Sequence, residues 1–275
     1  MLLQPLYSGV DLKPAFCLRY SWSGWPAAPA TFDTLRGPEI LDDVSAVWET
    51  DGLRLLEYNW SAEKIQLTFS ATPDVSPVFL ASRAKGRLQH ALRKADNPQD
   101  FSRKLSVRSI GNNTAEQVEA YIAQQVHKER FVDPEFAKKM QQFTVVDPSV
   151  DLSKPSHSGR GRYWYNLHIV LEVAERLQTL DLGQLEIVRD NCLKIAIKKG
   201  YLISRLSAML DHLHLAVRGD QAQSPADIVL AFQNNLACLL GQEKVWRETF
   251  YVGTFSEYDM GAVRNSSPIA GSRPT

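Results

Sequence analysis

The stretch LISRLSAMLDHLHLAVR, residues 202–218, decides the fold because its apolar and polar side chains alternate with the period of a β-strand. We expect a hairpin whose second strand carries LHLAVR. Ser224-Pro225 follows, which is typical of a helix N-cap with a first-turn proline, and predicts a helix over residues 225–241. The short strand FYVGTF comes next. This β-α-β order with a mixed sheet predicts an α+β fold.

The same order of patterns occurs earlier in the chain. An alternating stretch over residues 54–70 carries IQLTFS, a Ser-Pro pair opens a helix over residues 77–95, and the strand LSVRSIG follows. When the two copies are aligned at a fixed offset, the following residues correspond: Leu67 with Leu215, Ser76-Pro77 with Ser224-Pro225, Leu80 with Ile228, Leu88 with Leu236 and Leu92 with Leu240. The chain therefore contains two tandem copies of one sheet-plus-helix domain.

The segment TVVDPSVDLSKPSHSGRGR, residues 144–162, separates the copies. It is rich in Pro, Ser, Gly and charge and lacks an apolar period, which is typical of a linker. We expect a first domain over residues 1–143, a linker over 144–162 and a second domain over 163–256. The Gly/Ser/Pro-rich residues 257–275 are expected to form a flexible tail.

After its last strand the first copy continues as NNTAEQVEAYIAQQVHKERF. Thr114 with Gln117 three residues later forms a capping-box signature, and apolar residues repeat at helical spacing, which predicts a helix over residues 115–130. Tyr121 and Gln125 lie one turn apart on the same face of this helix. A tyrosine at apolar spacing is also typical of a core residue, so the helix alone leaves both interpretations open.

His212-Leu213-His214 lies inside the second copy's alternating stretch. Residues two apart on a strand point to the same face, so the two imidazoles can share one divalent metal. Packing or surface histidines give the same pattern. The first copy has Lys64 and Gln66 at the positions that align with His212 and His214. The domain is therefore expected to fold without the two histidines, and a purely structural role for them is less favoured.

Charge is balanced overall, with 31 Lys and Arg against 31 Asp and Glu, but one region of the first copy is basic. A helix and strand of this charge are expected to contact a phosphate backbone, although a solvated helix face has the same composition. The basic residues are Arg83, Lys85, Arg87, Arg93, Lys94, Arg103, Lys104 and Arg108.

The composition of the 275 residues, 44% of them hydrophobic, is that of an ordinary globular protein. No run of about 18 uncharged apolar residues occurs, so we expect neither a membrane span nor an export signal. The three cysteines form no CxxC pair, which argues against a disulfide framework or a cysteine zinc site. A cytoplasmic location is expected.

Taken together, these motifs resemble the single-tyrosine HUH transposases of small insertion sequences and REP-associated elements. The resemblance covers IQLTFSATPDVSP, LASRAKGRLQHALRK, FSRKLSVRSIG and NNTAEQVEAYIAQQV in the first half. In the second half it covers YNLHIVLEV, MLDHLHLAVRG, SPADIVLAFQNNLA and WRETFYVGTF. The His-hydrophobe-His motif corresponds to His212-Leu213-His214, and the Y-x-x-x-Q motif of the family corresponds to Tyr121 and Gln125.

The resemblance implies two tandem ferredoxin-like, HUH-type domains that cleave and rejoin single-stranded DNA through a 5′-phosphotyrosine at Tyr121. It also implies one Mg²⁺ or Mn²⁺ held by His212, His214 and Gln125, a DNA substrate that carries hairpins, and association with the nucleoid. Because these enzymes are typically dimers with exchanged tyrosine helices, the chain is expected to be a fused pseudo-dimer with one composite site. Such a chain can act as a monomer, and a homodimer is the alternative oligomeric state. The second site is expected to be dead, with Tyr258 as its only nearby tyrosine.

Three other interpretations compete with this one. A catalytically idle relative that binds DNA hairpins needs none of Tyr121, Gln125, His212 and His214, so their joint presence speaks against it. A small phosphoesterase with paired histidines usually carries a histidine motif in each half, which the first copy lacks. A pseudo-symmetric structural protein with an incidental His-Leu-His is the remaining alternative.

Overall fold

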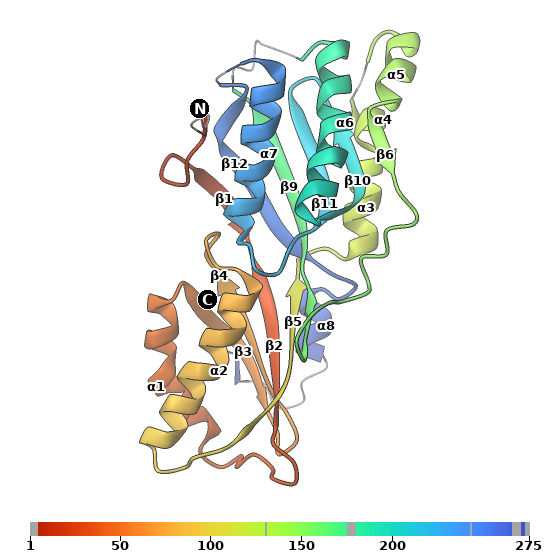
Figure 1. Cartoon of the computed structure of the whole chain (residues 1–275). Helices are drawn as coiled ribbons and strands as arrows, with labels where there is room; N and C mark the ends of the chain where they lie inside the picture. The colour runs from red at the N-terminus through yellow and green to blue at the C-terminus, as the bar shows by residue number, and fades with distance from the viewer. Residues whose placement is uncertain (1–4, 130, 175–179, 243, 266–270, 273–275) are drawn as a thin grey trace.

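The computed structural model describes residues 5–129, 131–174, 180–242, 244–265 and 271–272, and it consists of two sheet-and-helix units stacked end to end (Figure 1). One sheet has seven strands and the other has six. Each sheet is covered on one face by two helices, and the α+β fold class is confirmed. None of the helices in these ranges is long and apolar enough to cross a membrane.

The first unit contains the seven-stranded sheet in the order β13-β3-β4-β2-β5-β8-β7. Two helices, α1 and α2, pack against one face of it, where the apolar residues of each strand point. Its elements are β2 (Arg19–Pro26), α1 (Gly37–Thr50), β3 (Leu53–Trp60), β4 (Ile65–Ala71), α2 (Pro77–Lys94), β5 (Phe101–Ile110), β7 (Ser156–Ser158), β8 (Gly161–Trp164) and β13 (Gly271–Ser272).

The second unit contains the six-stranded sheet in the order β1-β12-β9-β11-β10-β6, and α6 and α7 cover one of its faces. Three further helices, α3, α4 and α5, lie beside this sheet, although they follow the strands of the first unit in sequence. The elements are β1 (Lys13–Cys17), α3 (Ala115–Ala123), α4 (Gln125–Lys128), α5 (Pro134–Gln141), β6 (Thr144–Val146), β9 (Asn166–Val173), α6 (Leu182–Lys199), β10 (Leu202–Ala208), β11 (His212–Arg218), α7 (Pro225–Leu240), β12 (Trp246–Phe255) and α8 (Met260–Asn265).

The repeated helices begin as their sequences predict. The Ser76 hydroxyl accepts a hydrogen bond from the backbone N–H of Phe79, and the Ser224 hydroxyl accepts one from the N–H of Asp227. Each cap is followed by a proline at the first helical position, where no N–H partner is needed. The two helices therefore extend over nearly the residues that the repeat predicts.

The two units share strands to a greater extent than the division at residues 144–162 predicts. β1 belongs by sequence to the first copy but pairs in parallel with β12 of the second sheet. The expected linker contains β6, which pairs with β10, as well as β7 and the start of β8, which lie at the edge of the first sheet. Short edge strands such as these need only backbone partners, so they leave no apolar period in the sequence.

The expected flexible tail over residues 257–275 is also ordered in part. α8 follows β12, and β13 pairs with β3, where Gly271 lies opposite Tyr58. These two segments carry secondary structure without an apolar period, because a helix of one or two turns that packs on another unit needs no strong amphipathic pattern of its own.

The ends of β5 and β12 cross between the units, and two hydroxyl groups join them reciprocally. Ser109 Oγ donates to the carbonyl oxygen of Phe255 at 2.7 Å, and Thr254 Oγ donates to that of Ile110 at 2.7 Å. Beyond the crossing, each chain segment passes to the other unit. α3 packs on β10 and β11, while the backbone N–H of Met260, which opens α8, donates to Gly111.

Gly111 lies at the closest approach of this crossing. A Cβ at this position would overlap the carbonyl oxygen of Thr254 and lie 3.1 Å from the Cα of Phe255. Both obstacles are backbone atoms, so no side chain can rotate away to make room. We predict that Gly111→Ala lowers the free energy of unfolding by about 1–3 kcal/mol, measured by urea denaturation.

Gly86 provides the matched control. It lies exposed on α2 with open space around its Cα, so Gly86→Ala is expected to stabilise the protein by about 0.5–1 kcal/mol through helix propensity. Equal effects of the two substitutions would contradict the close backbone approach at the crossing.

Candidate active site

The two histidines of the His-Leu-His motif lie on β11, on the face of the sheet that points away from α6 and α7. Leu213, Leu215 and Val217 point to the opposite face and belong to the main hydrophobic core. Strand alternation therefore places His212 and His214 side by side, with ring centroids 4.9 Å apart. The predicted common face of the pair is present.

The tyrosine helix α3 covers this histidine face. Val118 and Ile122 of α3 are buried against Ala216 of β11 and Phe255 of β12. The predicted capping box fixes the start of the helix, because Thr114 and Gln117 exchange side-chain to backbone hydrogen bonds. A helix that follows the first copy in sequence is thus held on the sheet of the second copy.

Docking of α3 brings Tyr121 next to the histidines. Its ring centroid lies 5.5 Å from that of His214 and 5.9 Å from that of His168, in edge-to-face arrangements. The ammonium of Lys128 lies 3.4 Å from the centroid of the Tyr121 ring. Tyr121 is 43% exposed, so its phenol is accessible to a substrate from solvent.

The helix that carries Tyr121 differs from the continuous helix predicted over residues 115–130. α3 ends at Ala123, and the short helix α4 begins at Gln125. Gln125 is nevertheless buried one turn after Tyr121, and its Nε2 donates to the Tyr121 carbonyl oxygen at 2.9 Å. The described hydrogen bond of Gln125 is thus made with the tyrosine backbone rather than with either histidine of the motif.

Both histidines of the motif are oriented by a second polar group. His212 Nδ1 lies 2.6 Å from the carboxylate oxygen Oδ1 of Asp211, and His214 Nδ1 lies 3.1 Å from His168 Nε2. Burial lowers the pKa of His168 to about 4 and that of His214 to about 2, so both rings are neutral at pH 7. The Nδ1 atoms of His212 and His214 both contact a polar neighbour. This leaves their Nε2 atoms available to bind a metal ion.

A cavity of about 230 Å³ adjoins the pair and is lined by Val170, Glu172, Val173, Asp211, His212 and His214. Two imidazoles whose Nδ1 atoms are engaged match the donor set that a divalent transition metal prefers. Within the described ranges, no group of three or more His, Cys, Asp and Glu side chains lies close enough together to bind a metal. Among the described residues, a third protein ligand would come from another residue type, such as the amide of Gln125.

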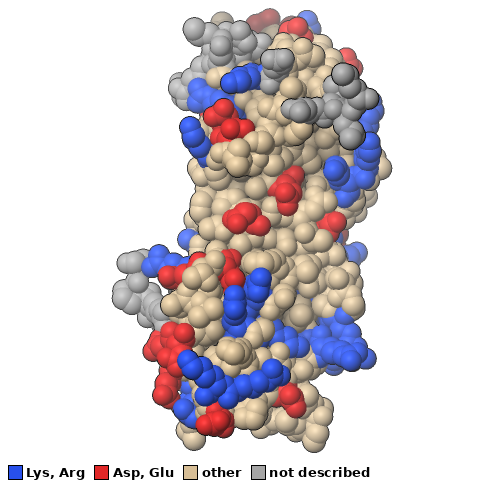
Figure 2. Space-filling model, turned by 60° about the vertical axis from the view of Figure 1, so that its left-hand side comes forward, with Lys and Arg blue, Asp and Glu red and all other residues tan. Residues whose placement is uncertain are grey.

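The eight basic residues expected to contact DNA fall into two groups. Four make structural interactions: Arg83 and Arg87 pair with Asp51, Lys85 donates to the Ser102 carbonyl, and Arg108 pairs with Glu257. The other four, Arg93, Lys94, Arg103 and Lys104, are exposed. Figure 2 shows Lys and Arg side chains in several groups around the first unit, with acidic groups among them. Their predicted role in DNA binding stays a prediction.

Sequence reasoning missed three residues of this site. His168 lies on β9 opposite Ala216, and its only signal was its place in the alternating stretch NLHIVLEV. Lys128 lies seven residues after Tyr121, a spacing of two helical turns. Asp211 directly precedes His212. None of the three forms part of a short motif, so only the folded arrangement reveals them.

The docking of α3 can be tested through Ile122, which is fully buried beneath the helix. We predict that Ile122→Ala lowers the free energy of unfolding by about 2–4 kcal/mol and accelerates amide hydrogen exchange in α3. Tyr121→Phe is the control, since it removes one exposed hydroxyl and leaves the packing intact. Unchanged exchange in α3 of Ile122→Ala would contradict the described docking.

Comparison with protein families gives one match, which covers less than half of the chain. Residues 162–265 match the family described as "Transposase IS200 like". The matched range contains the histidine face of β9 and β11 and ends in α8. No curated protein matches the chain. Over residues 162–265, the second half of the chain is therefore similar to the IS200-like transposases.

Proposed function

We propose that this protein is a transposase-type enzyme that cleaves and rejoins single-stranded DNA at one composite site, with Tyr121 as the nucleophile. The family of residues 162–265 supports a DNA-processing enzyme in general. The observation that carries the finer proposal is the position of the Tyr121 ring, 5.5 Å from His214, although the two residues come from opposite halves of the chain.

The proposed reaction is a transesterification. The phenol oxygen of Tyr121 attacks a backbone phosphorus, a tyrosine–phosphate bond forms, and the bond from phosphorus to the 3′ oxygen breaks. The Tyr121 proton is lost and the departing 3′ oxygen gains a proton, so the step releases a 3′-hydroxyl strand. The 5′-phosphate stays on the enzyme, and reversal by a 3′-hydroxyl rejoins the DNA without another energy source.

Lys128 is placed to help form the nucleophile. A free phenol has a pKa near 10, so forming the phenolate at pH 7 costs about 4 kcal/mol. The Lys128 ammonium, 3.4 Å from the ring centroid, favours negative charge on this side chain. Burial lowers the pKa of the Lys128 ammonium from its ordinary value.

The fit of the site to a divalent cation supports metal dependence as part of the proposal. His212, His214 and Gln125 would hold Mg²⁺ or Mn²⁺, which when bound supplies Lewis acidity toward a phosphate oxygen. The residues of the chain set up this donor set: Asp211 and His168 orient the two imidazoles, and burial lowers the pKa of His214.

The idle DNA-hairpin-binding module is less favoured than the enzyme. Binding alone does not require a buried, oriented histidine pair beside an accessible tyrosine. The phosphoesterase alternative is also less favoured, because the first unit carries Lys64 and Gln66 where a second histidine pair would be needed.

The nucleophile is tested by incubating labelled single-stranded oligonucleotides that contain hairpins with the protein and Mn²⁺, including a random-sequence pool. We predict a protein-linked band on a denaturing gel for the wild type and its loss in Tyr121→Phe, whose folding and DNA binding are retained. Loss is also expected in His212→Ala. Adduct formation by Tyr121→Phe at the wild-type rate would refute the assignment of the nucleophile.

The role of His168 is tested by Mn²⁺ titration, followed by the loss of the free-ion electron paramagnetic resonance signal. His168→Phe keeps a ring of similar size but removes the partner of His214 Nδ1, and we expect about tenfold weaker Mn²⁺ binding. His168→Gln restores a polar partner and is expected to recover part of the affinity. Equal affinities of wild type and His168→Phe would show that the contact does not orient the ligand.

A further inference from the structure

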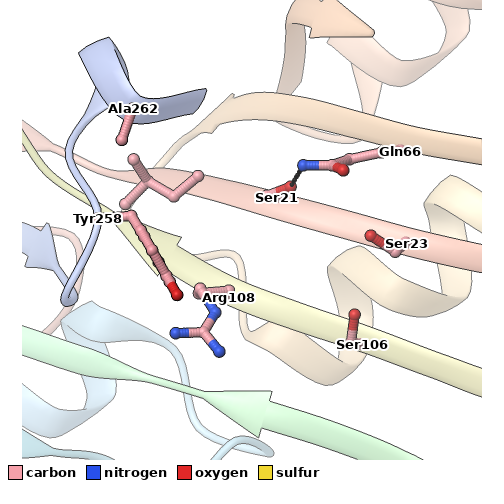
Figure 3. Close-up of a pocket in the computed structure, with 8 residues that line it drawn as sticks. Ser21, Ser23, Gln66, Ser106, Arg108, Tyr258 and Ala262 are labelled. Atoms are coloured by element: carbon pink, nitrogen blue, oxygen red, sulfur yellow. Dashed lines mark hydrogen bonds between the residues drawn. The ribbon is translucent and has the colours of Figure 1, made fainter. Parts of the chain in front are cut away.

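The first unit contains a cavity of about 380 Å³ on the face of its sheet that points away from α1 and α2 (Figure 3). Strands β2, β4 and β5 form its floor, and the segment around α8 closes one side. The lining residues are Ser21, Ser23, Gln66, Ser106, Arg108, Ile110, Tyr258 and Ala262.

This cavity occupies the place that corresponds to the histidine face of the second unit. Gln66 aligns with His214, and the strand pairing then places Ser21 at the position of His168. Both units have a polar contact between these two positions. In the first unit Gln66 Nε2 donates to Ser21 Oγ at 3.0 Å, and in the second His214 Nδ1 lies 3.1 Å from His168 Nε2. The first unit has thus lost the imidazoles of this face and retained a polar concave surface.

The chemistry of the lining fits a neutral, flat ligand with hydrogen-bonding edges. Three serine hydroxyls offer both donors and acceptors, and the Tyr258 ring, 53% exposed, offers an aromatic surface at the rim. The Gln66 amide accepts from Lys64 Nζ at 3.0 Å and donates to Ser21, so it holds the lining in place. The charge of Arg108 is compensated by Glu257 at 2.6 Å, and its guanidinium lies 4.0 Å from the Trp164 ring centroid. A free phosphate would have to compete with that carboxylate, so the lining favours a nucleobase.

A larger groove of about 980 Å³ meets the cavity at Ser106, which lines both. Lys104, Arg160 and Arg162 line the groove and are exposed, against one acidic residue, Glu63. A groove of this charge accommodates a phosphodiester backbone, while aromatic and polar groups beside it take up unstacked bases.

We propose that the cavity binds one unpaired base of single-stranded DNA whose backbone lies along the Lys104–Arg160–Arg162 groove. This inference rests on the proposed function only in taking single-stranded DNA as the ligand. The first unit then binds the DNA strand, while Tyr121 and the histidine face lie on the second unit.

The test measures binding of fluorescent abasic oligonucleotides with and without one central base, in four versions that carry A, C, G or T. Tyr121→Phe is the background, so that cleavage does not disturb the measurement. We expect at least one base to raise the affinity about tenfold over the fully abasic strand, the size of a single stacking and hydrogen-bonding site. If none of the four bases raises the affinity, the proposal is overturned.

Ser106→Phe fills the cavity from β5 and is expected to abolish the gain. Gln66→Ala is a second variant that removes the amide without adding volume, and it is expected to reduce the gain severalfold. The matched control is Ser82→Phe on the exposed side of α2, where the gain should persist. A full gain in both cavity variants would overturn the proposal.

Failure of this proposal is distinguishable from failure of the proposed function. A wild-type protein that forms the Tyr121 adduct but shows no single-base gain retains its catalytic assignment and loses the cavity assignment. A protein that shows the cavity-dependent gain but forms no adduct supports the cavity and contradicts catalysis.

Discussion

The crossing of β5 and β12 is the constraint on which the rest of the structure depends. Two buried hydroxyls, Ser109 Oγ and Thr254 Oγ, each donate to a carbonyl oxygen of the opposite strand, and Gly111 allows the backbones to approach. An unpaired buried polar group would cost about 1–3 kcal/mol, so this reciprocal pairing favours one arrangement of the units. Because each strand continues beyond the crossing, α3 reaches the second sheet and α8 reaches the first.

In the proposed function, the exchange of these helices places the chemistry on the second unit and strand binding on the first. The histidine face receives a helix with an accessible tyrosine, and its histidines are oriented by Asp211 and His168. The corresponding face of the first unit carries serines and an amide, with a basic groove beside it. With a single proposed site, the two strand cleavages that transposition needs have to occur in sequence or on two molecules. A nickase or strand-joining factor derived from a transposase meets this constraint equally well.

Much of the fold could be predicted because alternation and capping are local signals. The period of two along residues 202–218 placed His212 and His214 on one face, and the Ser-Pro and Thr114–Gln117 signals located three helix starts. What the sequence did not reveal depends on distant contacts. β1, β6 and β7 are edge strands defined by their partners, and the break after Ala123 divides a helix whose pattern is continuous. His168 belongs to the candidate site only through its contact with His214, a residue 46 positions away.

The central claim is that one chain supplies both the tyrosine and the histidine pair of its own site. It is tested most directly by mixing Tyr121→Phe with His212→Ala in equal amounts and measuring the covalent DNA adduct with Mn²⁺. Each variant lacks a different part of the site, so exchange between chains would rebuild one intact site. We expect no adduct in the mixture under conditions where the wild type forms it. Adduct formation by the mixture at a substantial fraction of the wild-type yield would show that the site is assembled between molecules.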